Sequence, residues 1–83
     1  MSNVATVILF GAAADRAGTR QTEVPVNDGT TLWELWPVLA DRYPDLEPMR
    51  DTLAFAVNGE YARMVDSVSP GDEVAVLPPV SGG

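Results

Sequence analysis

The sequence predicts one small α+β domain, in which a single main helix packs on one face of a mixed β-sheet. The chain has 83 residues, which is the size of one domain. Its hydrophobic content of 46% is sufficient for a folded core. Short β-branched apolar runs stand before and after one segment with helical periodicity. We therefore expect the domain at residues 1–77 and an extended tail at residues 78–83.

The first part of the expected sheet is a hairpin. Residues 4–10 (VATVILF) form a continuous apolar run that is typical of a strand buried on both faces or nearly so. Residues 11–19 are small and turn-prone, and we expect a long loop there. Residues 21–26 (QTEVPV) then return as a second strand. Pro25 cannot donate to a ladder, which places this strand at an edge of the sheet.

One helix follows the hairpin. Thr31 and Glu34 have the spacing of a capping box, in which each side chain satisfies a free backbone N–H of the other residue. Pro37 removes one backbone hydrogen bond and is expected to kink the helix, and Pro44 ends it. The apolar face repeats with the helical period at Leu32, Leu35, Trp36, Leu39 and Tyr43. The next apolar residues are expected to form a loop packed back on the core: Leu46, Met49 and Leu53.

Three more strands are expected after the helix. Residues 53–57 (LAFAV) form the third strand, and Asn58-Gly59 is a strong tight-turn signal before a short returning strand at residues 60–62. Residues 69–72 (SPGD) form another turn. Residues 73–77 (EVAVL) form the last strand.

This order of elements predicts a β-grasp, or ubiquitin-like, architecture. A helix that crosses from a hairpin to later strands lies on one face of a mixed sheet, and the first and last strands are natural parallel neighbours at its centre. Strand alternation then separates two faces. If the helix covers the face of Val7 and Val74, then Phe10, Leu77 and Tyr61 belong to an open apolar face that is a candidate partner surface.

Composition excludes most side-chain chemistry. The chain has no Cys, no His and no Lys, and all five of its basic residues are Arg. The commonest nucleophiles, general bases and metal ligands are therefore missing. The net charge of −7 argues against nucleic acid as a partner. No apolar run approaches the ~20 residues that cross a membrane, and no secretory signal is visible, so we expect a cytoplasmic protein.

The tail offers the chemistry that the side chains lack. Pro78 and Pro79 hold the chain extended and cannot join a sheet. Gly82 and Gly83 have no side chains, so such an end can enter a tunnel too narrow for a Cβ. A carboxylate on Gly83 is then a handle that another enzyme can activate as an acyl-adenylate. The alternative interpretation is an inert glycine-rich terminus.

The sequence also resembles a known family, the small subunit of molybdopterin synthase. The most specific similarity is the C-terminal stretch at residues 77–83 (LPPVSGG), and the resemblance extends over essentially the whole chain. Many members of that family carry an Arg-Glu pair where this chain has Ala14-Asp15. Three further stretches resemble the family: residues 70–75 (PGDEVA), residues 57–61 (VNGEY), and residues 7–12 (VILFGA) followed by Gly18-Thr19.

The resemblance implies a sulfur-carrier function. An adenylating enzyme of the ubiquitin-activating type would use ATP to activate Gly83, and a sulfur donor protein would convert it to a thiocarboxylate. The tail would insert into the large synthase subunit, in a heterotetramer, and give its sulfur to cyclic pyranopterin monophosphate. Partner contacts are implied at Phe10, Tyr61, Leu77 and the two prolines. The chain itself would be non-catalytic and would bind no cofactor or metal.

Other interpretations of the same features remain open. A sulfur carrier for thiamine or cysteine synthesis shares the Gly-Gly end, but the Pro-Pro-Val-Ser approach fits it less well. A ubiquitin-like modifier would be joined by its terminus to lysines of its targets. A plain binding module would have an inert tail. Fold alone does not separate these functions, because β-grasp domains serve many roles.

Overall fold

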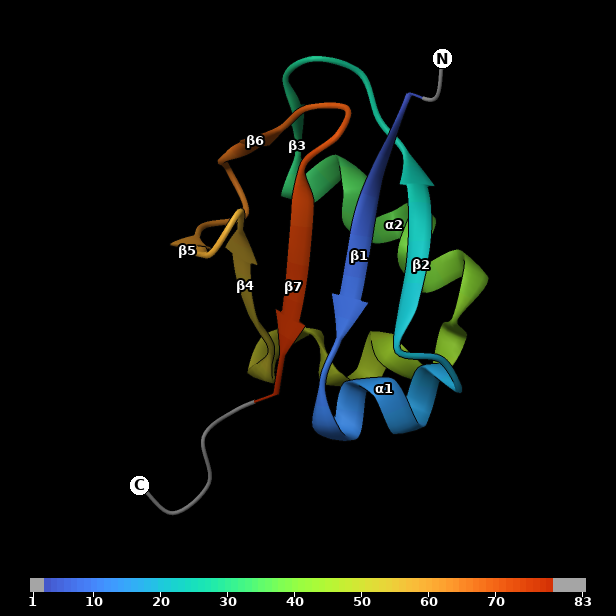
Figure 1. Ribbon diagram of the computed structural model, residues 1–83. Helices are drawn as coiled ribbons and strands as arrows, with labels where there is room; N and C mark the ends of the chain where they lie inside the picture. Colours follow the sequence, from blue (N-terminus) through green and yellow to red (C-terminus); the bar gives the residue numbers. More distant parts are fainter. Residues whose placement is uncertain (1–2, 79–83) are drawn as a thin grey trace.

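The fold is a five-stranded mixed sheet with its helices packed against one side and one end (Figure 1). The computed structural model describes residues 3–78. The strand order is β2-β1-β7-β4-β5, which is the predicted class. The strands are β1 (Val4–Leu9), β2 (Gln21–Pro25), β4 (Ala54–Val57), β5 (Glu60–Ala62) and β7 (Glu73–Leu77).

The first and last strands are parallel neighbours at the centre of the sheet, as predicted. Val7 of β1 is paired with Val74 of β7, and Leu9 with Val76. The other pairings, β1 with β2, β7 with β4, and β4 with β5, are antiparallel. β2 lies at an edge, which confirms the position inferred from Pro25.

The helix α2 (Leu32–Arg42) covers one face of this sheet (Figure 1). Its capping box is present: the backbone N–H of Glu34 donates to Thr31 Oγ1 at 3.2 Å, and the backbone N–H of Thr31 donates to Glu34 Oε1 at 3.0 Å. The helix continues through Pro37, which is exposed. Its buried stripe meets the sheet in the core, which includes Leu32, Leu35, Trp36, Leu39, Ala5, Val7, Leu9, Val74 and Val76.

Two expected loops are helical instead. Residues 11–17 form α1 (Gly11–Ala17), so the prediction of a loop there is wrong. Its alanines favour a helix, Ala13 is buried against the core, and Gly18 ends the helix in the left-handed region at φ 75°. Residues after α2 form the 3₁₀ helix η1 (Pro44–Thr52). Leu46 is buried there, so the expected packing is confirmed although the loop is not.

A second, two-stranded sheet was not predicted. It pairs β3 (Thr30–Thr31) with β6 (Ser67–Val68) in the antiparallel sense. The backbone N–H of Leu32 then donates to the carbonyl of Asp66 at 3.1 Å, and that of Trp33 donates to Met64 at 2.9 Å. The segment after β5 thus holds the start of α2, and it satisfies two of the N–H groups that a helix leaves free at this end.

A polar cluster joins the two turns at the start of β7. Asn58 and Gly59 both have positive φ, 52° and 86°, which is the geometry of a two-residue hairpin turn. Asn58 Nδ2 donates to Asp72 Oδ1 at 3.1 Å, and the backbone N–H of Glu73 donates to Asn58 Oδ1 at 2.9 Å. The backbone N–H of Ser69 donates to Asp72 Oδ2 at 2.9 Å. Two hydrogen bonds lower the pKa of Asp72. The larger effect comes from the backbone N–H of Ser69, and the smaller from the side chain of Asn58.

This cluster predicts a contribution to stability that depends on pH. Because the pKa of Asp72 is lower in the folded chain than its ordinary value of 3.8, the ionised carboxylate stabilises the fold above that value. The contribution is lost as the pH falls through the folded-state pKa. We expect Asp72→Ala to reduce the free energy of unfolding at pH 7 by about 1 kcal/mol, with a smaller difference from wild type at pH 2. Urea denaturation at the two pH values measures this.

Asp41→Ala is the matched control, because Asp41 is exposed on α2. Equal losses for Asp72→Ala at pH 7 and pH 2 would contradict the role of the ionised carboxylate.

Candidate functional site

The face of the sheet opposite α2 carries the side chains predicted as a partner surface. One row crosses four strands through Ile8, Ala75, Ala56 and Tyr61, since each of these residues is the register partner of the next. Strand alternation places this row away from the buried side chains of Val7, Val74 and Phe55. The row is therefore on the open face.

A second row lies nearer the end of β7. Leu77 is paired with Ala54 of β4. The backbone N–H of Phe10 donates to the carbonyl of Val76 at 3.2 Å, which continues the parallel ladder by one residue and places Phe10 beside Leu77. Phe10 is 45% exposed and Tyr61 is 81% exposed, whereas Leu77 is half-buried. Three of the five residues predicted as partner contacts thus share one face.

We call this surface the open face and define it by seven residues. Small side chains occupy its middle, and larger ones stand on either side. Ala56 is only 8% exposed, although α2 covers the other side of the sheet. A partner with bulky apolar side chains would be able to approach the backbone closely over the alanines. The seven residues of the open face are Ile8, Phe10, Ala54, Ala56, Tyr61, Ala75 and Leu77.

The tail begins at the edge of this open face. β7 ends at Leu77, and Pro78 follows half-buried beside Gly11. A Cβ placed on Gly11 would lie 3.0 Å from Pro78 Cγ, so the absence of a side chain there permits the close contact. Pro79, Gly82 and Gly83 were also predicted as site residues, and they lie outside the described residues.

The remaining polar side chains do not form a metal site within residues 3–78, where no three Asp, Glu, His or Cys groups are close enough to hold an ion. In the same part of the chain two ion pairs occur, Arg50 with Asp51 at 3.3 Å and Arg63 with Asp66 at 3.9 Å. Each pair has at least one largely exposed member, and such surface ion pairs contribute little to stability.

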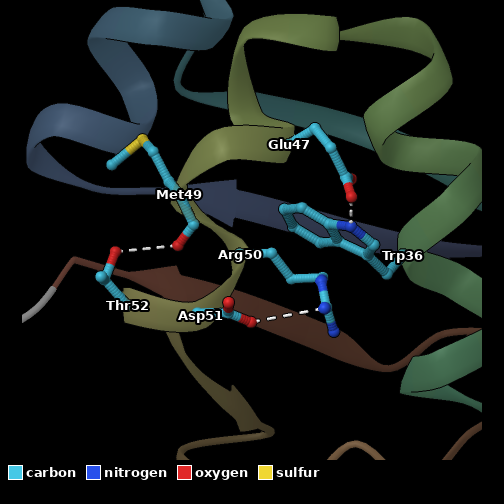
Figure 2. A network of polar contacts seen from close by, with 6 residues as sticks. All are labelled: Trp36, Glu47, Met49, Arg50, Asp51 and Thr52. Atoms are coloured by element: carbon cyan, nitrogen blue, oxygen red, sulfur yellow. Dashed lines mark hydrogen bonds and ion pairs between the residues drawn. The ribbon is translucent and has the colours of Figure 1, made fainter.

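Sequence reasoning missed a contact network between α2 and η1 (Figure 2). Trp36 Nε1 donates to Glu47 Oε2 at 2.8 Å, and the Trp36 ring meets the Phe55 ring edge to face, with centroids 5.8 Å apart. Arg50 lies on the same 3₁₀ helix, with its guanidinium 5.3 Å from the centre of the Trp33 ring. No sequence motif signals these contacts, because they join segments that meet only in the folded chain.

A five-stranded sheet of this order with one crossing helix defines a β-grasp domain of the ubiquitin-like class. Comparison with known proteins then identifies the family. The chain belongs to the ThiS family, whose model matches residues 7–83.

Relatives in this family carry two kinds of name. The molybdopterin synthase sulfur carrier subunit of Homo sapiens is 36% identical over 80 residues, which cover 93% of this chain and 91% of the human protein. Small archaeal modifier protein 1 of Haloferax volcanii is 34% identical, with 90% of this chain and 95% of that protein covered. A crystal structure of SAMP1 from the same organism superposes with a TM-score of 0.84 at 31% identity, covering 96% and 99% of the two chains.

The structure also bears on the expected relation to membranes. None of the helices within residues 3–78 is both long and apolar enough to span a membrane.

Substitutions on the two faces of the sheet are expected to affect the free energy of unfolding differently. Tyr61 and Phe55 lie on neighbouring strands, but Phe55 is buried against Trp36 and Tyr61 is exposed. We expect Phe55→Ala to lower the free energy of unfolding by about 3–5 kcal/mol, and Tyr61→Ser to change it by no more than about 0.5 kcal/mol. Urea denaturation measures both. A large loss for Tyr61→Ser would show that Tyr61 serves the fold and not a partner.

Proposed function

We propose that the chain is the sulfur-carrier subunit of a molybdopterin synthase. The observation that carries this proposal is the position of the open face, which stands at the point where the C-terminal tail leaves β7. A partner that covers Phe10 and Leu77 therefore receives the tail at its own surface. The family and the human relative named a molybdopterin synthase sulfur carrier subunit support the same function.

The proposed chemistry takes place on the carboxylate of Gly83. One carboxylate oxygen attacks the α-phosphate of ATP on an adenylating enzyme of the ubiquitin-activating type, and pyrophosphate leaves. A sulfide equivalent from a sulfur donor protein then attacks the carbonyl carbon, and AMP leaves. The product is a thiocarboxylate at the end of the tail. ATP serves the activating enzyme as a co-substrate and is not bound by this chain.

The sulfur is then passed on inside the complex with the large subunit. The thiocarboxylate sulfur displaces an oxygen substituent from a carbon of cyclic pyranopterin monophosphate, so that a C–S bond forms as a C–O bond breaks and the oxygen leaves with the bonding electron pair. Water hydrolyses the resulting thioester, which leaves the sulfur on the product and returns Gly83 to a carboxylate. A dithiolene has two sulfur atoms, so two loaded carriers are consumed for each product, which is in keeping with a heterotetramer of two small and two large subunits.

The proposed roles of this chain and of the large subunit follow from the residues that this chain contains. The chain has no His, Cys or Lys to act as base, nucleophile or Schiff-base former. Groups that bind the substrate and move its protons must then come from the large subunit. Gly82 and Gly83 lack side chains, which suits them to a narrow active-site passage, and Pro78 and Pro79 favour an extended approach.

The first test is the intact mass of the chain after incubation with ATP, a sulfide source and the adenylating enzyme. We expect a gain equal to the replacement of one oxygen by sulfur, localised to Gly83 by fragmentation. Deletion of Gly82 and Gly83 is expected to abolish this gain and all sulfur transfer, with urea denaturation unchanged. Sulfur transfer by the truncated chain would refute the mechanism.

The second test concerns the open face. We expect Phe10→Asp and Leu77→Asp each to weaken the complex with the large subunit by at least about tenfold, because a charge would be buried in an apolar contact. Isothermal titration calorimetry measures the affinity, and circular dichroism checks folding. Val38→Asp is the control, since Val38 is an exposed apolar residue on α2, which covers the other face. An unchanged affinity for Phe10→Asp and Leu77→Asp would defeat the interface.

A second candidate function is protein modification. It is favoured by the similarity to small archaeal modifier protein 1 and to the SAMP1 structure. In that case the activated Gly83 would be attacked by a lysine amine of a target, with AMP as leaving group. Mass spectrometry of cell extracts separates the two functions: an isopeptide between Gly83 and target lysines supports the modifier, and a thiocarboxylate without such conjugates supports the carrier.

A further inference from the structure

A groove runs beside β5, at the edge of the sheet farthest from β2. It has a volume of about 320 Å³ and lies between the start of α2, the end of η1 and the strands β4 and β5. We call it the β5 groove. Its residues that matter here are Trp33, Arg50, Asp51, Ala54, Tyr61 and Arg63.

The β5 groove is continuous with the open face. Ala54 and Tyr61 belong to both, and Ala54 is the register partner of Leu77 at the end of β7. The groove also includes Phe55 and Trp33 of α2, so a partner that covers Phe10 and Leu77 would reach it by passing around the β5 edge of the sheet. Two large exposed aromatic side chains, Tyr61 and Trp33 (49% exposed), line it.

The β5 groove is less acidic than the chain as a whole. The net charge of the chain is −7, with only five cationic side chains, and two of these, Arg50 and Arg63, line the groove with Asp51 as the one acid. Each arginine also has an ion-pair partner in the chain, Asp51 and Asp66, so the groove is close to neutral on an otherwise acidic domain. An anionic group of a partner would be repelled by most of this surface, and here it would be able to take the place of Asp66 as the partner of the exposed Arg63.

The two arginines are presented differently. Arg50 has its guanidinium 5.3 Å from the centre of the Trp33 ring and 3.3 Å from Asp51, as the ion pair in Figure 2 shows. Its guanidinium thus lies over an aromatic ring, within the range of a cation–π contact, and already pairs with one carboxylate. The side chain of Arg63 is 83% exposed, and its ion pair with Asp66 is long at 3.9 Å. Such an exposed pair rearranges at little cost.

We propose that the β5 groove is a second contact site for the large subunit, and that it receives an acidic side chain flanked by an apolar one. The carboxylate pairs with Arg63 and Arg50, and the apolar neighbour lies between Trp33 and Tyr61. This inference rests on the proposed function and adds to it the chemistry of the partner. The open face supplies apolar area, and the groove fixes the orientation and accelerates association through charge.

The test compares two charge reversals in the full-length chain. Arg63→Glu and Arg16→Glu make the same change in net charge, but Arg16 lies exposed on α1 and does not line the groove. The backbone N–H of Arg63 donates to Asp66 Oδ2 at 2.8 Å, and any residue except proline at this position retains that bond. We expect Arg63→Glu to weaken binding of the large subunit at least tenfold at low salt, and Arg16→Glu less than twofold.

Salt dependence gives an independent readout. We expect the affinity of wild type to fall as salt is raised, because the contact is between charges near the surface. The uncharged variant Arg63→Gln should show a weaker dependence on salt than wild type. Equal effects of Arg63→Glu and Arg16→Glu, or an unchanged salt dependence in Arg63→Gln, would overturn the proposal.

The outcomes distinguish this inference from the proposed function. If Phe10→Asp weakens the complex and Arg63→Glu does not, the groove proposal alone fails. If neither variant weakens it, the interface of the proposed function fails as well.

Two other occupants of the groove are also tested. An indole NMR signal assigned by its loss in Trp33→Phe reports on the groove in the free chain. A shift of that signal on deletion of Gly82 and Gly83 would assign the groove to the chain's own tail. If the chain without its partner forms a homodimer, and Arg63→Glu dissociates that homodimer, the groove would be assigned to a second copy of the chain. Either result would overturn the proposal.

Discussion

The parallel pairing of β1 with β7 is the constraint on which the rest of the structure depends. It brings segments from opposite ends of the sequence into contact, with Val7 beside Val74 and Leu9 beside Val76, all of them buried. A parallel pair cannot be closed by a tight turn, so the chain between them must cross one face of the sheet. α2 makes that crossing, and its stripe of Leu32, Leu35 and Leu39 provides the apolar cover.

The same pairing gives the two faces of the sheet different environments. The covered face contains the core, whereas the open face collects Phe10, Leu77 and Tyr61 from three distant segments. Because the tail continues from β7, its starting point is fixed at the rim of the open face. This geometry explains how a domain without Cys, His or Lys would present a reactive terminus to a partner, as proposed here for a member of the ThiS family.

Charged residues are distributed unevenly over the surface. The chain carries a net charge of −7, yet Arg50 and Arg63 meet in one groove beside the open face. At the opposite end of β7, Asp72 accepts hydrogen bonds from Ser69 and Asn58 and ties two turns together. The acidic group there stabilises the fold, whereas Arg63 at the groove is exposed and has only a long ion pair with Asp66.

The sequence by itself determined the elements that follow from local rules. The capping box at Thr31 and Glu34, the Asn58-Gly59 turn and the span of β7 depend on neighbouring residues, and all were predicted. Phe10, Tyr61 and Leu77 were placed on one face by strand alternation, whereas Pro79, Gly82 and Gly83 remain predictions. Only the tertiary structure decided η1 and the β3–β6 pair, because their local preferences are weak and packing selects them. The alanines of α1 favour a helix, but seven residues are too few to be stably helical without the packing of Ala13 on the core. The cation–π contact of Arg50 with Trp33 likewise joins segments that are separated in the sequence, so no local pattern predicts it.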